Sequence, residues 1–127
     1  MLGALAVAAG GAAGSLLRWW ATLAAAQIGW GAFPWSTIAI NVAGSFAIGW
    51  FAAATLPSGP SPASYELRLL VLTGLLGGFT TFSAFSLQTL DLVRAGDWTA
   101  AASNVLLSVV LCLAAVALGY WVGTPAP

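Results

Sequence analysis

A run of aromatic and hydroxyl side chains between residues 77 and 86 could form a binding site for a small anion. Phe82 and Phe85 are three residues apart, so on a helix they project from one face, next to the face that carries Ser83 and Ser86. The edge of an aromatic ring is partially positive, and beside hydroxyl donors it could stabilise a small anion that loses its water. Phenylalanine ordinarily faces lipid or the protein core, so both interpretations stay open on these residues alone.

Polar side chains in other apolar segments are further candidates. Asn41 stands in the middle of such a segment, where its carboxamide could donate to an anion or form only an interhelical hydrogen bond. Arg18 is the one strong charge that falls within an apolar segment, at a cost of about 2.5 to 3.5 kcal/mol on insertion scales. It could attract anions at a vestibule, or it could extend to the lipid headgroups. Ser108 adds one more hydroxyl.

Membrane-spanning helices must position these side chains. The chain has 127 residues, of which 61% are hydrophobic and 5% charged, with a mean hydropathy of +0.98, which indicates an integral membrane protein. Four segments are long enough to cross a bilayer, at residues 2–28, 35–56, 67–93 and 100–122. We therefore predict an all-α, multi-pass protein of the cell inner (plasma) membrane in which residues 1–127 form a single domain.

The third segment is predicted to be broken near its middle. It exceeds the roughly 20 residues that a helix needs to cross a bilayer. Its centre contains Gly77, Gly78, Thr80 and Thr81, which are poor helix formers. Non-helical backbone at membrane depth is tolerated only where protein buries it or water reaches it. The break therefore predicts a discontinuous transmembrane helix at a functional site.

Small residues recur at a spacing of four in every predicted span. The pairs are Gly10 with Gly14, Ser45 with Gly49, Gly74 with Gly78, and Gly119 with Gly123. Such pairs let helices approach closely, so together they favour a tightly packed helical assembly.

The positive charges give almost no topological bias. With four spans, Arg68 marks one side of the membrane and Arg94 the other, while Arg18 lies inside or near the end of the first span. The positive-inside rule needs an excess on one side. The balance permits insertion in both orientations, and a small four-span bundle favours an antiparallel homodimer.

Composition argues against an enzyme and against a nucleic-acid partner. The chain has three arginines, no lysine and no histidine, so it lacks a basic surface and a side chain that titrates near neutral pH in its unperturbed state. One cysteine cannot form an intramolecular disulfide or a cysteine metal cluster. We expect the protein to have no catalytic residues.

Three separated segments together resemble signatures of the Fluc/CrcB fluoride channels. They are residues 10–18, 41–46 and 77–86, and their order, spacing and four-span layout agree with that family over nearly the whole chain. The resemblance implies a dual-topology antiparallel homodimer with two fluoride pores. It also implies a fluoride-selective, passive channel that lets cytoplasmic fluoride leave the cell and so lowers its toxicity.

The resemblance assigns roles to individual residues. Arg18 matches the family arginine near the vestibule, and the broken third span implies a structural sodium ion at the dimer centre, held by backbone carbonyls of Gly77 and Thr80 from both chains. Two positions depart from the family: Ala84 stands where threonine is frequent, and Gln88 where glutamate is frequent. The implied pore residues are Asn41, Phe82 and Phe85, with Ser83, Ser86 and Ser108 on or near a polar track.

Two other functions compete with this interpretation. A small multidrug-resistance-type, proton-coupled exporter has a similar length, but it needs an acid embedded in the membrane. Glu66, Asp91 and Asp97 all lie at predicted span edges. A structural membrane subunit would explain the small-residue pairs, but it would not explain the broken third span.

Overall fold

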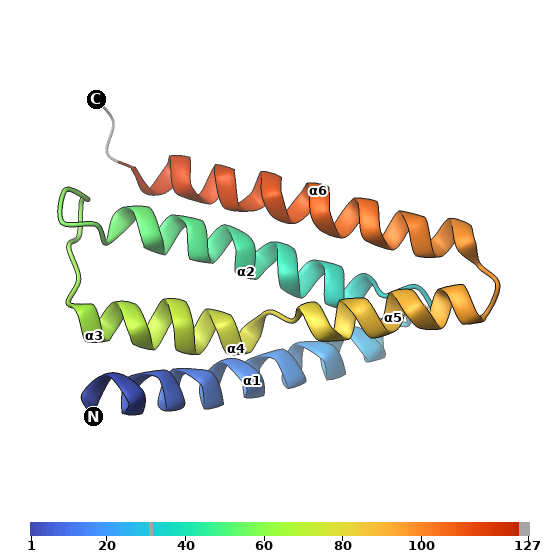
Figure 1. Cartoon of the computed structure of the whole chain (residues 1–127), viewed down its shortest axis with the longest axis horizontal. Coiled ribbons are helices and arrows are strands. Elements are labelled where there is room, and N and C mark those ends of the chain that lie inside the picture. Colours follow the sequence, from blue (N-terminus) through green and yellow to red (C-terminus); the bar gives the residue numbers. More distant parts are fainter. Residues whose placement is uncertain (31, 125–127) are drawn as a thin grey trace.

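The computed structural model describes residues 1–30 and 32–124, and within them four helical spans are long and apolar enough to cross a membrane. Neighbouring spans along the chain run in opposite directions (Figure 1). The prediction of an all-α membrane protein is confirmed. The spans are α1 (Leu2–Ile28), α2 (Trp35–Ala54), the third span (Tyr65–Arg94) and α6 (Trp98–Gly123). Gly31 and residues 125–127 of the predicted single domain lie outside the described residues.

Local capping explains where the spans differ from the predicted boundaries. The third span begins earlier than predicted because the Ser64 hydroxyl accepts from the Leu67 N–H at 3.2 Å. In the same way, α6 begins at Trp98 because Asp97 Oδ1 accepts from the Ala100 N–H at 2.9 Å. The C-terminal end of α2 comes two residues before the predicted end, at Ala54.

The third span consists of several pieces and is interrupted near its middle. A first turn, α3 (Tyr65–Arg68), continues into a π-helix, η1 (Leu69–Leu76), and into the short α4 (Gly77–Phe79). Thr80 and Thr81 are extended, with φ/ψ of −82°/159° and −151°/115°. The helix resumes as α5 (Phe82–Arg94). The predicted break is confirmed, whereas the π-helix was not predicted.

The first half of the third span packs directly on α1 through backbone contacts. A Cβ atom at Gly10 would overlap the carbonyl oxygen of Leu70, and one at Gly14 would overlap that of Leu75. Residues five apart in a π-helix lie above one another, as residues four apart do in an α-helix. The π-helix therefore aligns two successive carbonyls with two successive glycines, and this close approach needs residues without side chains.

The second close contact joins α2 and α6. A Cβ at Gly49 would overlap the carbonyl oxygen of Val116, and one at Gly119 would overlap that of Phe46. Helices whose backbones approach this closely gain dispersion contacts that do not depend on water, which is the main source of helix association in lipid. The small-residue pairs thus hold the bundle together in two tight helix pairs.

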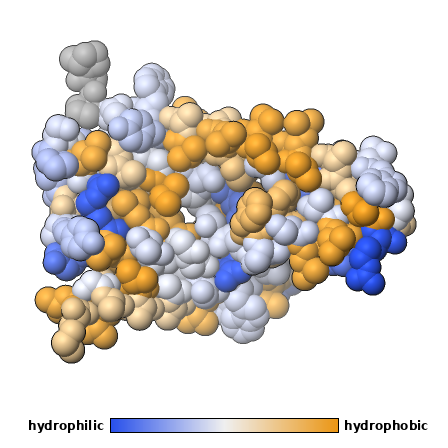
Figure 2. Space-filling model, viewed as in Figure 1, coloured by the Kyte–Doolittle hydropathy of each residue, from blue (hydrophilic) through white to orange (hydrophobic). Residues whose placement is uncertain are grey.

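The outer surface suits a bilayer. Hydrophobic residues form a broad band along the upper side of the visible face, and the most hydrophilic residues gather mainly at the two ends of the molecule (Figure 2). The N-terminus, the connection between α2 and α3 and the C-terminal end of α6 lie at one end, and the connection between α5 and α6 lies at the other (Figure 1).

Candidate functional site

Asn41 closes the break in the third span. Its Oδ1 accepts from the Thr81 N–H at 2.8 Å, and its Nδ2 donates to the Thr81 carbonyl at 3.0 Å. The side chain thereby satisfies both backbone groups of a non-helical residue at membrane depth, where unbonded groups are costly. A carboxamide has two N–H donors, so the second one is left for another partner.

Arg18 binds the same segment from α1. Its Nε donates to the carbonyl of Gly78 at 3.1 Å, and the contact is partly buried. The side chain therefore turns toward the break in the third span. The Nε bond leaves the terminal N–H groups of the guanidinium for other partners.

Arg18 also lines a cleft of about 350 Å³ between α1, α2 and α5. Of the described residues that line this cleft, none is acidic, and several carry hydroxyl groups. One guanidinium beside several hydroxyl donors gives the cleft the polarity that attracts an anion. The polar lining residues are Ser15, Arg18, Thr22, Thr37, Thr81 and Gln88.

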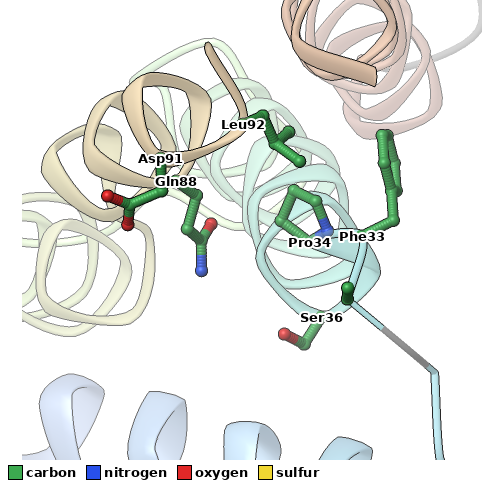
Figure 3. Close-up of a pocket in the computed structure, with 7 residues that line it drawn as sticks. Phe33, Pro34, Ser36, Gln88, Asp91 and Leu92 are labelled. Atoms are coloured by element: carbon green, nitrogen blue, oxygen red, sulfur yellow. The ribbon is translucent and has the colours of Figure 1, made fainter. Parts of the chain in front are cut away.

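Gln88 lies between this cleft and an outer cavity of about 330 Å³ that opens beside Asp91. Figure 3 shows Gln88 and Asp91 on α5 across from Pro34 and Ser36 at the start of α2. The Gln88 Oε1 atom is buried and has no hydrogen-bond partner among the described residues. Gln88 is one of the two residues at which the sequence is expected to depart from the family.

Thr81 starts α5 and so sets the direction of the helix that carries the phenylalanines. Its hydroxyl accepts from the Ala84 N–H at 3.2 Å and lies 3.2 Å from the Ser83 hydroxyl. Threonine is a favoured N-cap residue because its oxygen satisfies one of the free N–H groups of the first turn. Ala84 contributes its backbone N–H to this cap.

The break also releases backbone carbonyls. In a continuous helix the Thr81 N–H would donate to the carbonyl of Gly77, but here it donates to Asn41. The Ala84 N–H likewise donates to the Thr81 hydroxyl, and Thr80 is extended, so the Thr80 carbonyl lies outside both helices. Gly77 is exposed on the surface of the chain.

Phe82 and Phe85 are in contact, as their spacing predicts. Their ring centroids are 5.2 Å apart and the rings are tilted by 52°. Phe82 is 76% exposed, whereas Phe85 is 8% exposed. The pair therefore extends from the surface of the chain to its interior beside the break, and tilted rings direct partially positive edges toward their neighbours.

The three serines predicted to lie on or near the polar track differ in exposure. Ser83 and Ser86 are exposed on α5, and the Ser86 hydroxyl donates to the Phe82 carbonyl at 2.9 Å. Ser108 is 7% exposed on α6, inside the bundle. The serines lie on two helices, and the sequence could not show that Ser108 is buried while Ser83 and Ser86 are exposed.

A polar network behind Phe85 was missed from the sequence. Thr89 donates to the carbonyl of Phe85 at 2.8 Å, and Asn104 Nδ2 donates to Thr89 Oγ1 at 2.8 Å. The Ser108 hydroxyl donates to Asn104 Oδ1 at 3.5 Å. Asn104 could have been found by the reasoning that singled out Asn41, because it is also an amide within an apolar segment, in the second turn of α6.

These features define a class of protein. Polar groups and broken helices at membrane depth are typical of proteins that carry ions or solutes across the membrane. The chain is therefore a small helical transport protein. The model of the protein family described as "CrcB-like protein, Camphor Resistance (CrcB)" matches residues 5–120. The chain therefore belongs to the CrcB family.

Several relatives of this chain are named fluoride-specific ion channel FluC. The one from Paramagnetospirillum magneticum is 52% identical over 93% of this chain and 92% of its own length. That from Opitutus terrae is 53% identical over 91% of this chain and 88% of its own length. That from Rhizobium johnstonii is 49% identical over 94% of both chains. These relatives confirm the resemblance stated above over almost the full length of the chain.

Proposed function

We propose that this protein is a fluoride-selective passive channel that exports cytoplasmic fluoride across the inner (plasma) membrane. The observation that carries the proposal is the broken third span, where Asn41, Arg18 and the Phe82–Phe85 pair converge at membrane depth. Membership of the CrcB family and the names of the FluC relatives support a fluoride channel. A channel is not an enzyme, and those names agree with the absence of catalytic residues that composition predicts.

Selectivity follows from how fluoride loses its water. Fluoride is small and tightly hydrated, so a pore must replace that water with closely placed donors, and a narrow cross-section excludes larger halides. The second N–H of Asn41, the Ser108 hydroxyl and the edges of the Phe82 and Phe85 rings supply such donors without a full positive charge. Arg18 stands at the cleft, where its charge raises the local concentration of anions.

The exposed residues beside the break in the third span are better covered by a second copy of the chain than by lipid. Gly77, Phe82, Ser83 and Ser86 are all exposed beside the break. Lipid cannot satisfy released backbone or hydroxyl groups at this depth. A second copy in the opposite orientation would cover these groups with the same polar residues, since a two-fold interface uses one patch twice. This antiparallel homodimer would contain two pores.

The released carbonyls fit a structural sodium ion at the dimer centre. Carbonyl oxygens of unwound backbone are suitable ligands for a hard cation. Gly77 and Thr80 would supply such oxygens, and the exposure of Gly77 supports a location on the surface that a second copy would cover. The ion would neutralise these dipoles and hold the two breaks in register. Sodium-free protein is expected to lose fluoride flux and to regain it on titration with sodium chloride, but not with choline chloride.

The competing functions fit the structure less well. A proton-coupled exporter needs an embedded acid, yet Glu66 and Asp97 stand at helix starts and Asp91 is one turn from the end of α5. A structural subunit would use the glycine pairs, but these pairs are already filled by helices of the same chain.

Fluoride efflux from liposomes that contain only this purified protein tests the proposal. A fluoride electrode records release, a potassium ionophore balances charge, and chloride serves as the comparison. Rapid fluoride release without comparable chloride release is expected. No release from a folded, dimeric protein would overturn the channel and reopen the exporter and subunit alternatives.

A further inference from the structure

The buried face of α6 carries an asparagine that no part of the proposed pore explains. Asn104 is 1% exposed, which makes it the most deeply buried polar side chain among the described residues. Burying a carboxamide is unfavourable unless its donors and acceptor are bonded. An apolar side chain of similar size would fill the same space without this requirement.

The hydrogen bonds of Asn104 have a fixed direction. The Thr89 hydroxyl donates its single proton to the Phe85 carbonyl at 2.8 Å. Thr89 can therefore offer only lone pairs to Asn104. The carboxamide must turn its NH₂ group toward Thr89, and its Nδ2 donates to Thr89 Oγ1 at 2.8 Å.

This orientation determines which atom Ser108 meets. With the NH₂ group directed at Thr89, Oδ1 of Asn104 faces Ser108 one turn later on α6, and the hydroxyl donates to it at 3.5 Å. That separation is long, since such bonds are usually about 2.7 to 2.8 Å. This hydrogen bond gives the buried Ser108 hydroxyl a partner. It is weak enough that the hydroxyl can leave it and donate to a stronger acceptor.

We propose that Asn104, held by Thr89, is a positioning residue that keeps the Ser108 proton available to fluoride. This inference rests on the proposed function, in which Ser108 is a pore residue. Fluoride is a stronger acceptor than an amide oxygen, so the hydroxyl turns from Asn104 to the ion as it arrives and turns back when the ion leaves. No covalent bond changes in this exchange.

The role of Thr89 is to prevent the carboxamide from rotating. If Thr89 could not accept, the amide of Asn104 could turn its NH₂ group toward Ser108. The serine would then accept a hydrogen bond, and its own proton would no longer have a fixed direction. Thr89→Val removes this acceptor with almost no change in shape, and Thr89→Ser retains it.

The test measures fluoride release from liposomes at a protein density so low that most vesicles carry one channel or none. The fraction of vesicles that empty counts folded channels, and the rate at which they empty measures transport by each. Thr89→Val and Asn104→Leu are expected to lower the rate about tenfold, which corresponds to one lost hydrogen bond along the path, at an unchanged active fraction. Thr89→Ser is expected to stay close to the unmutated protein.

A double-mutant cycle tests whether Asn104 acts through Ser108. Asn104→Leu should lower the rate no further in a Ser108→Ala background, because the hydroxyl that it positions is already gone. A normal rate in Thr89→Val, a fall in active fraction alone, or an additive loss in the double mutant would each overturn the positioning role. If the unmutated protein released no fluoride, the proposed function would fail and this role with it.

Discussion

Asn41 and Thr81 exchange two hydrogen bonds, in which the side-chain amide of one residue pairs with the backbone of the other at 2.8 and 3.0 Å. The pair resembles two residues that exchange backbone hydrogen bonds in a β-sheet, except that the Asn41 side chain on α2 takes the place of one of the two backbones. It lets the third span leave the helical conformation without unbonded groups. The asparagine therefore stabilises the break, and its second N–H is not used by this pair.

Asn41→Asp should damage both stability and transport. The acid keeps an acceptor for the Thr81 N–H but places a second oxygen against the Thr81 carbonyl, where a donor is required. We expect the free energy of unfolding to fall by about 1 to 3 kcal/mol. Thermal unfolding in detergent and liposome efflux measure the two effects. Gln27→Glu is the control, because it makes the same chemical change at an exposed position of α1. Equal stability of the two variants would contradict the role assigned to Asn41.

Phe82→Ile and Phe85→Ile should both largely abolish fluoride flux. Their effects on stability should differ, because the two side chains lie in different environments. Phe82 is 76% exposed, so its replacement should leave the stability of the chain unchanged. Phe85 is 8% exposed, and its replacement should also lower stability because it leaves a cavity. Efflux and gel filtration of the dimer separate these effects.

Trp121→Ile provides the comparison for Phe82→Ile. Trp121 is an aromatic residue at 74% exposure on α6, close to the exposure of Phe82 but far along the chain from the break. Its replacement is expected to leave flux unchanged. Normal flux in both phenylalanine variants would disprove the part assigned to the rings.

The sequence predicted the spans and the break because both depend on local properties of the chain. Apolar length gives the spans, and the glycines and threonines around residue 78 give the break. The contacts that support the break could not be predicted, because they join residues 40 and 60 positions apart: Asn41 to Thr81, and Arg18 to Gly78. No local pattern encodes such a pairing.

The π-helix and the Asn104 network escaped prediction for a different reason. The amino-acid sequence of η1 is ordinary for an apolar α-helix. Its wider turn is explained only by the packing of the Leu70 and Leu75 carbonyls against the two glycines of α1. Asn104 shows the same signal as Asn41, an amide among apolar residues, but its partner Thr89 lies on a separate helix. The direction of their bonds follows from three-dimensional contact alone.

Gly10→Ala and Gly14→Ala should each destabilise the fold. The new methyl group would overlap the carbonyl oxygen of Leu70 or Leu75, so α1 and η1 would have to separate. Overpacking of this kind costs about 1 to 3 kcal/mol. Gly11→Ala is the matched control, since no atom outside its own stretch of α1 lies within 4 Å of the position that its Cβ would take. In thermal unfolding, Gly11→Ala should be as stable as the unmutated protein. An equal loss of stability in all three variants would refute this explanation.

Dual topology predicts that a charge bias will inactivate the channel and that two opposite biases will restore it. Ser58→Lys with Ser61→Lys adds positive charge at one exposed end of the bundle, and Ala95→Lys with Thr99→Lys adds it at the other. Cytoplasmic connections retain positive charge, so each double variant should insert in one orientation only. Alone, neither could form an antiparallel dimer, and cells should lose fluoride export.

Co-expression of the two double variants supplies both orientations and should restore export and the dimer. Differently tagged copies report pairing by co-purification, and cysteine labelling from outside the cell reports orientation. Single variants inserted in one orientation that still export fluoride would show that the chain works without an inverted partner. Restoration that occurs only on co-expression would instead require antiparallel pairing, because the two variants share every pore residue and differ only in the charge at their ends.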